Sequence, residues 1–217
     1  MASEVDICNL ALAHLGDDAS IISIDPPEGS AQAAHCAQMY PMARDFILDT
    51  NRWSFCTRRI QLAELTNTNT AWLYAYAVPD DALDVFSIVP NDATDDYGST
   101  TSDNWGSQVS QAYTPQPYTL EADDSGNTVI YTNQQNAVAR YIIRVTETGK
   151  FPPTLVVAIS WQLASFLAGV VVKGDAGAAM GLRCQQFADK FTAQAKQSDA
   201  QQQRLSVQQV VPWMAVR

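Results

Sequence analysis

The spacing of the hydrophobic residues changes twice along this chain, and that change limits the folds that it can adopt. Near the N-terminus they recur every three or four residues, as in Cys8, Leu12 and Leu15, which is typical of a helix packed on one side. From about residue 60 to residue 146 they alternate, as in Tyr74 and Tyr76, which indicates strands. Helical spacing returns after residue 152. We therefore expect an α+β protein in which a helical bundle from both chain ends carries an inserted antiparallel β domain.

The expected bundle comprises residues 1–59 and 150–198. Ser3 is a good N-cap for the first helix, and Gly16 ends that helix. Pro41 lies within the second helix, so we expect a kink or a split there. Ser30 can cap this second helix, whose expected inner face consists of Ala33, Cys36, Tyr40, Ala43 and Ile47.

The third expected helix raises the question of a membrane, because residues 155–172 contain no charged side chain. About 18 apolar residues is the lower limit for a spanning helix. This stretch also holds Ser160, Gln162 and Ser165, which favours a buried central helix, capped by Thr154, over a membrane span. The apolar face of a fourth helix consists of Met180, Cys184, Phe187, Phe191 and Ala195.

The β-rich insertion is expected at residues 60–149. Its polar stretch between Pro90 and Pro117 is interpreted as a long mobile loop, and residues 123–127 suit a hairpin turn. The strand candidates are Asp84–Val89, Tyr118–Ala122, Thr128–Thr132 and Val138–Thr146. The aromatic residues could form a sugar-binding platform, but their alternation with small apolar residues favours core packing. One side of a strand is expected to hold Trp72, Tyr74, Tyr76 and Val78, and Trp53 and Phe55 precede it.

The charge balance argues against a nucleic-acid-binding domain. The chain has 13 Lys and Arg residues against 23 Asp and Glu residues, a formal net charge of -10, so it would repel the phosphate backbone of nucleic acid. The four cysteines are scattered without paired spacing, which indicates reduced thiols in a core. The N-terminus shows no basic region followed by an apolar run, so we expect no signal peptide.

No sequence motif indicates catalysis. His14, His35, Cys8 and Cys36 lack the paired spacing of a zinc site, and the acidic residues of the long loop do not match a calcium-binding loop. A serine-hydrolase elbow, a phosphate-binding glycine loop and a dinucleotide fingerprint do not occur. We therefore expect no catalytic residues, no metal and no cofactor, and hence no enzyme.

Several stretches, taken in order, resemble a known family. After the first helix come MARDFIL (42–48), NRWSF (51–55) and RRIQL (58–62). The stretches WLYAYAVPDDAL (72–83), ARYIIRV (139–145) and FPP (151–153) follow, and then an apolar helix and an Ala-rich helix. This order is similar to tail tubular protein A, the head-to-tail adaptor of short-tailed bacteriophages. The resemblance covers roughly residues 3–200, apart from the long loop.

The resemblance implies a structural virion protein located in the tail or neck of the particle and assembled in the bacterial host cytoplasm. About twelve copies would form a homo-oligomeric ring that joins the portal protein to the tail nozzle, or tail tubular protein B. The ring would extend the DNA channel and help to retain the genome. DNA would pass without specific binding, as the acidic composition also favours, and no membrane would be involved.

The last segment, residues 199–217, is expected to be an extended C-terminal arm. Its Gln-rich start can extend without a core, and its apolar end is too short to build one. The apolar residues of this end suit a pocket on the portal or on a neighbouring subunit. The expected partner-binding residues are Val210, Val211, Trp213 and Met214. The same residues could instead fold back on their own bundle.

Two other functions remain open from the sequence. A carbohydrate- or ligand-binding module of a phage particle would use the aromatic strand and the acidic loops. A hydrolase of the lysis or entry apparatus would need a site that forms only in the folded protein. An adaptor would assemble with the portal, whereas either alternative would stay a small oligomer with a ligand.

Overall fold

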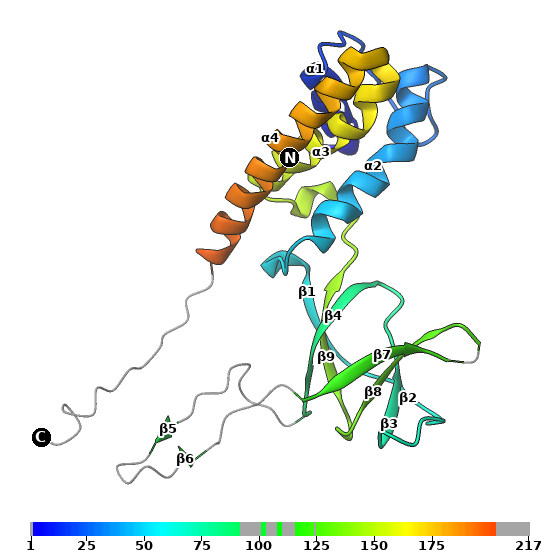
Figure 1. Ribbon diagram of the computed structural model, residues 1–217, viewed down its shortest axis with the longest axis vertical. Coiled ribbons are helices and arrows are strands. Elements are labelled where there is room, and N and C mark those ends of the chain that lie inside the picture. The colour runs from blue at the N-terminus through cyan, green and yellow to red at the C-terminus, as the bar shows by residue number, and fades with distance from the viewer. Residues whose placement is uncertain (1, 92–100, 103–107, 110–115, 124, 203–217) are drawn as a thin grey trace, which may run out of the picture. The chain divides into compact units, whose positions relative to one another are not determined.

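Two compact units make up the described part of the chain, and Figure 1 labels their helices and strands. The computed structural model describes residues 2–91, 101–102, 108–109, 116–123 and 125–202. The helical unit contains residues up to 56 and those from 144 onward, and the strand unit contains residues 57–143. Helices and antiparallel sheets are both present, so the protein belongs to the α+β class.

Helix α1 (Glu4–His14) begins at the predicted cap. The Ser3 hydroxyl accepts from the Asp6 amide at 3.1 Å, and the Asp6 carboxylate accepts from the Ser3 amide at 2.8 Å. The backbone hydrogen bond from Ser3 is the main cause of a lowered pKa of Asp6. Gly16, with φ of +76°, follows the helix end, where a residue with a side chain would be strained.

Helix α2 (Ala31–Asp49) begins after Ser30, whose hydroxyl accepts from the Ala33 amide. All five residues of the predicted inner face are buried. The helix runs unbroken through Pro41, so the split that we considered does not occur. Pro41 is exposed and lacks an amide hydrogen, and the Ala37 carbonyl therefore loses its helical partner.

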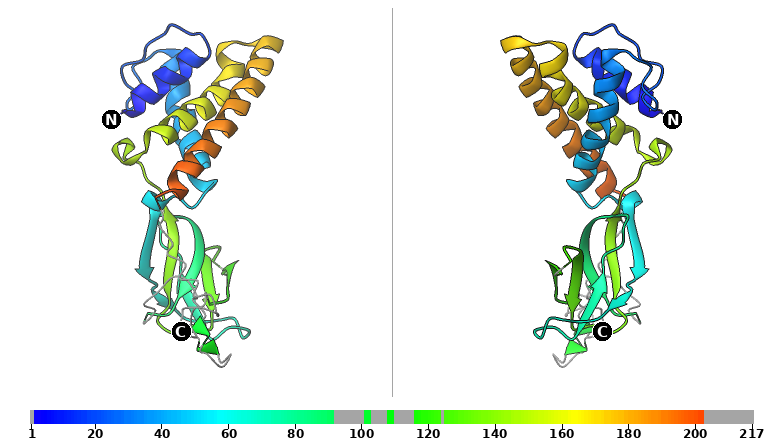
Figure 2. Two further views of the ribbon diagram at one scale, coloured as in Figure 1. Left: turned by 90° about the vertical axis from the view of Figure 1, so that its left-hand side faces the viewer. Right: turned by 90° about the vertical axis from the view of Figure 1, so that its right-hand side faces the viewer.

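Helix α3 (Pro153–Val171) lies against α1, α2 and α4 (Gly174–Ala200), as Figure 2 shows. It is long and apolar enough to cross a membrane, but half of its most apolar window is buried within the protein. This burial is what a central core helix requires. Pro152, and not Thr154, is its N-cap, because Pro153 already has helical geometry at the first turn.

Helix α4 differs from the prediction in its buried face and in its end. Phe187 and Phe191 are only half-buried and lie beside the ring of Trp161. Small residues make the closest approach to α3, since bulky rings would hold the two helices apart. The helix also includes Asp199 and Ala200, which we had assigned to the arm. The buried residues of α4 are Gly177, Cys184, Ala188, Thr192, Ala195 and Asp199.

The strand unit contains two antiparallel sheets of three and four strands. In the first, β9 (Val138–Ile143) lies between β1 (Thr57–Gln61) and β4 (Ala82–Val89). The second has the order β2 (Glu64–Leu65), β3 (Tyr74–Ala77), β8 (Thr128–Thr132) and β7 (Tyr118–Ala122). The predicted hairpin turn joins β7 to β8 and places Gly126 at a φ of +83°.

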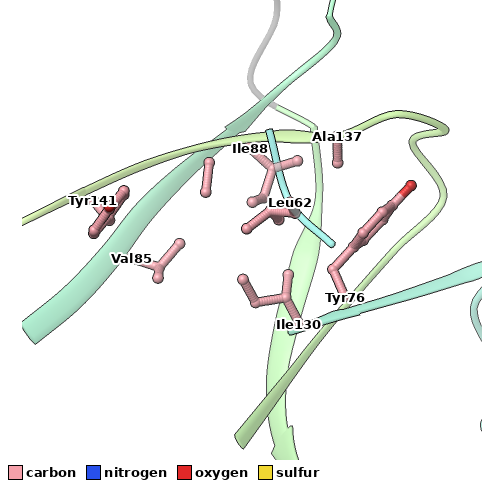
Figure 3. Packing of buried hydrophobic residues seen from close by; sticks show 8 residues of the cluster. Leu62, Tyr76, Val85, Ile88, Ile130, Ala137 and Tyr141 are labelled. Atoms are coloured by element: carbon pink, nitrogen blue, oxygen red, sulfur yellow. The ribbon is translucent and has the colours of Figure 1, made fainter. Parts of the chain in front are cut away.

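One hydrophobic core joins the two sheets of the strand unit (Figure 3). Val85, Ile88 and Tyr141 come from the first sheet, and Tyr76 and Ile130 come from the second. Tyr76 is fully buried, and so is Trp53 in the helical unit, so these two aromatic residues pack in cores and are not available to stack on a sugar. Trp72 was predicted to lie on the side of the strand that holds Tyr76. It does not, because β3 begins only at residue 74.

Some predictions fall beyond or near the edges of the described residues. The loop predicted between Pro90 and Pro117 is described only at its ends and at two short strands, β5 (Thr101–Ser102) and β6 (Gln108–Val109), which pair with each other. The strand unit starts at residue 57, slightly before the predicted start at residue 60, and ends at residue 143, slightly before the predicted end at residue 149. Short 3-10 turns at Ser54–Cys56 and Thr148–Lys150 lie in the helical unit at these two junctions.

Candidate functional site

The predicted partner-binding residues lie outside the residues that the structure describes. Val210, Val211, Trp213 and Met214 therefore remain predictions from the sequence. A site must be sought in the described part of the chain, where no three His, Cys, Asp or Glu side chains gather as metal ligands would.

The helical unit carries a half-open groove of about 290 Å³ between three helices, here called the α2–α4 groove. The end of α2 forms one wall, α4 forms the other, and a single residue of α3 lies at the bottom. The lining residues are Phe46, Ile47, Thr50, Gln162, Asp189, Thr192, Ala193 and Lys196.

Gln162, at the bottom of the groove, has its side-chain amide paired by hydrogen bonds. The amides of Gln162 and Gln185 exchange two hydrogen bonds, of 3.1 and 3.2 Å, between α3 and α4. The Gln162 amide nitrogen also donates to the Ser165 hydroxyl at 3.2 Å. Gln162 is buried, so an unpaired amide at this position would be costly. The pair therefore holds α3 and α4 in one register next to the groove.

Thr192 is the exception among these polar groups. Its side chain lines the groove and is 93% buried, at 7% relative exposure. Its hydroxyl oxygen has no hydrogen-bond partner within the described structure. A buried hydroxyl without a partner is unfavourable by about 1 to 3 kcal/mol. The oxygen itself has less than 1 Å² of exposed surface, so the groove does not reach it.

The rim of the groove combines an apolar edge with two opposite charges. Phe46 is 50% exposed, and its ring meets Phe166 edge-on with centroids 6.4 Å apart. Lys196 donates to the Thr50 carbonyl at 2.8 Å, so its cation lies at the C-terminal end of α2, where a positive charge is favourable. Asp189 accepts from the Gln185 amide at 3.0 Å. This arrangement suits an inserted apolar side chain with polar groups on both sides of it.

A histidine and a serine also meet in the helical unit, but they are not arranged for nucleophilic catalysis. His14 Nε2 lies 3.1 Å from the Ser160 hydroxyl, which itself donates to the Val157 carbonyl at 2.8 Å. The serine proton is thus already used, and the histidine acts as the donor to the serine oxygen. His14 stacks on Trp161 at 3.6 Å, and burial lowers the pKa of this histidine.

The four cysteines are buried and free, as predicted for core residues. The hydrogen bond with the Cys36 thiol, followed by burial, raises the pKa of Cys8. Burial, followed by the nearby charge of Asp199, raises the pKa of Cys56 to about 12. A thiol that stays protonated at neutral pH is a poor nucleophile, so Cys8 and Cys56 serve as packing residues.

Sequence reasoning did not find the α2–α4 groove. Gln162 was visible as a polar residue within an apolar helix, which was a signal for a buried polar contact. Thr192 gave no such signal, because a threonine among the polar residues of α4 resembles an exposed position.

Comparison with models of protein families finds no family that matches this chain. A search of curated proteins likewise finds no match.

Proposed function

We propose that this protein is a structural virion protein, a head-to-tail adaptor that forms a ring between the portal and the tail. In this proposal the helices from both chain ends act as one bundle, and the strand unit is a β domain inserted into it. The ring extends the DNA channel and helps to retain the packaged genome. The resemblance of residues 3–200 to tail tubular protein A supports this function.

The structural observation that carries the proposal is an exposed apolar strip on α2. Phe46, which lines the α2–α4 groove, is 50% exposed, and Met42, one helical turn before it, is 62% exposed. Residues four apart share one face of a helix, so the strip is continuous. Exposed large apolar side chains that lie together next to a groove are typical of protein–protein interfaces.

The charge of the chain fits the proposed channel. A formal net charge of -10 opposes binding to the phosphate backbone, so packaged DNA could slide through a ring of such subunits. The partners are then other copies of this chain, the portal protein and the tail nozzle, which is tail tubular protein B in the family that it resembles. The site of action is the tail or neck of the virion.

The proposal is tested by mixing the purified protein with the portal encoded in the same genome and measuring the mass of the products. We expect a complex that contains the portal and about twelve added copies. Phe46→Ser should reduce the complex, whereas Leu182→Ser, which changes a 71% exposed residue away from the groove, should not. An intact portal that gains no mass at any ratio would contradict the adaptor function.

A further inference from the structure

Two cysteines face each other between the first two helices of the helical unit. Helices α1 and α2 lie side by side (Figure 2). Cys8 of α1 and Cys36 of α2 have no exposed surface, and a hydrogen bond joins their thiols. Both thiols are free. We call these two residues the Cys8–Cys36 pair.

The register of the two helices holds the pair together. The Gln32 side chain donates to the Asp17 carboxylate at 3.5 Å, so the end of α1 lies beside the start of α2. Burial, followed by the nearby charge of Glu4, raises the pKa of Tyr40. Glu4 precedes the cysteine of α1 by one helical turn, and Tyr40 follows the cysteine of α2 by one turn. The helices therefore run antiparallel, and the two cysteines meet at the same level.

The two thiols of the pair differ in acidity. The hydrogen bond from the Cys8 thiol lowers the pKa of Cys36. The same bond, followed by burial, raises the pKa of Cys8. The thiolate is the reactive form in oxidation, so Cys36 reacts before Cys8. A second thiol in contact with a reactive one converts the first oxidation product into a disulfide.

We propose that the Cys8–Cys36 pair is a redox cross-link site, at which a peroxide joins α1 to α2 through a disulfide. The Cys36 thiolate attacks one oxygen of hydrogen peroxide, the O–O bond breaks, and hydroxide leaves, so Cys36 becomes a sulfenic acid. The Cys8 sulfur loses its proton and attacks the Cys36 sulfur, whose S–O bond breaks. The two thiols lose two electrons, and one peroxide is reduced to two waters that carry the thiol protons.

The bond needs little movement of the chain. A disulfide has an S–S length of about 2 Å, and two sulfurs in hydrogen-bond contact approach each other by rotation about their Cα–Cβ bonds. Hydrogen peroxide is nearly as small as water, and it reaches the buried pair when the 11-residue helix α1 opens locally. The reaction is therefore slow compared with that of an exposed thiol.

The cross-link goes beyond the proposed adaptor function and does not depend on it. The bond closes a loop from residue 8 to residue 36, which removes conformational freedom from the unfolded chain and stabilises the folded one. In the proposed virion protein it forms after the particle leaves the reducing host cytoplasm, because disulfides persist in oxidising surroundings.

The other two cysteines of the chain are internal controls. Cys56 is buried beside the charge of Asp199. Cys184 is also buried, and it precedes Asp199 by 15 residues of α4, or about 22 Å along a helix that rises about 1.5 Å per residue. Cys56 and Cys184 are therefore too far apart to join in the folded protein. Contact in the native fold selects the Cys8–Cys36 pair, whereas unfolding allows every pairing.

Peptide mapping after oxidation tests the proposal. The full-length protein is treated with hydrogen peroxide in native buffer and, in parallel, in urea, and the remaining thiols are blocked with iodoacetamide. Cleavage after Glu, Lys and Arg then places the four cysteines in four separate peptides, which are residues 5–28, 29–44, 53–58 and 184–190. Cys36→Ser should abolish the cross-link, and the matched variant Cys184→Ser should retain it.

In native buffer we expect peptide 5–28 joined to peptide 29–44 at least about ten times more often than any pairing with Cys56 or Cys184, because contact raises the effective concentration of one thiol beside the other. Urea should remove this preference. The cross-linked protein should unfold at a temperature higher by about 5 to 10 °C, and dithiothreitol should reverse the shift.

Three results would overturn the proposal. The first is equal abundance of all pairings in the native protein. The second is a native protein whose thiols all remain open to iodoacetamide, or whose Cys36 is oxidised further without a cross-link, at a peroxide dose that joins thiols in urea. The third is an unfolding temperature that does not rise. Binding to the portal is measured with the reduced protein, so the adaptor function stands or fails separately.

Discussion

The carboxylate of Asp199 in α4 accepts three hydrogen bonds from Ser54, which lies 145 residues earlier in the chain. The Ser54 hydroxyl donates at 2.5 Å, and its backbone amide donates to the two carboxylate oxygens at 3.1 and 3.2 Å. Asp199 is buried, so its charge depends on these donors. The contact fastens the last turn of α4 to the 3-10 turn that follows α2.

Asp199→Asn should destabilise the protein by about 1.5 to 3 kcal/mol, the usual contribution of hydrogen bonds to a charged group. An asparagine has one acceptor oxygen, and its amide nitrogen would face the Ser54 amide as a second donor. Urea denaturation measures the change. Asp189→Asn is the control, since this exposed acid on the same helix accepts one hydrogen bond and should change stability by no more than about 0.5 kcal/mol. Equal effects of the two variants would show that the Ser54 contact contributes nothing specific.

Thr192→Val should stabilise the isolated subunit by about 1 kcal/mol, because it removes a buried hydroxyl that has no partner and keeps the shape of the side chain. Thr132→Val provides the matched opposite. The buried Thr132 hydroxyl donates to the Pro117 carbonyl at 2.9 Å, so its removal should destabilise by about 1 to 3 kcal/mol. Thermal unfolding of both variants checks the signs. A loss of stability in Thr192→Val would mean that its hydroxyl is already satisfied in the free subunit.

Acidification should weaken the fold through His14. Burial lowers the pKa of this histidine in the folded protein below its ordinary value of 6.5, so the unfolded chain binds the proton more readily. The contribution of His14 to stability is therefore fully present above pH 6.5 and declines as the pH falls below it. Chemical denaturation at pH 7.5 and at pH 5.5 should show a larger loss for the natural protein than for His14→Gln. Identical losses would contradict a buried neutral histidine.

Truncation after Gln203 should leave the fold intact while it removes the predicted partner-binding residues of the arm. Helix α4 ends at Ala200, so the shortened chain keeps Asp199 and its contact with Ser54. Circular dichroism should show unchanged helical content and melting, and binding to the portal should be lost. Unfolding of the shortened chain would instead indicate that the arm docks on its own subunit.

The sequence predicted most helices and strands because their signals were local. The strands Tyr118–Ala122 and Thr128–Thr132 have the predicted bounds, since alternation and the turn at Gly126 fix both ends. Helix α1 follows from its capping residues in the same way. Trp72 was assigned to the wrong side of the strand, because the alternating pattern was extended to residues before the start of the short strand β3.

The contacts of α4 could not be predicted from periodicity. Hydrophobicity ranked Phe187 and Phe191 as core residues, whereas close packing against α3 selected the small residues Ala188 and Thr192. The bond from Ser54 to Asp199 joins distant parts of the chain and leaves no local pattern. The α2–α4 groove depends on three helices that meet only after folding, so its residues share no motif.

The most direct test of the adaptor proposal is electron microscopy of the full-length protein mixed with the portal from the same genome. The account predicts a closed ring of about twelve copies on one face of the portal. An intact portal without added density, among free subunits that show the expected fold by circular dichroism, would contradict it.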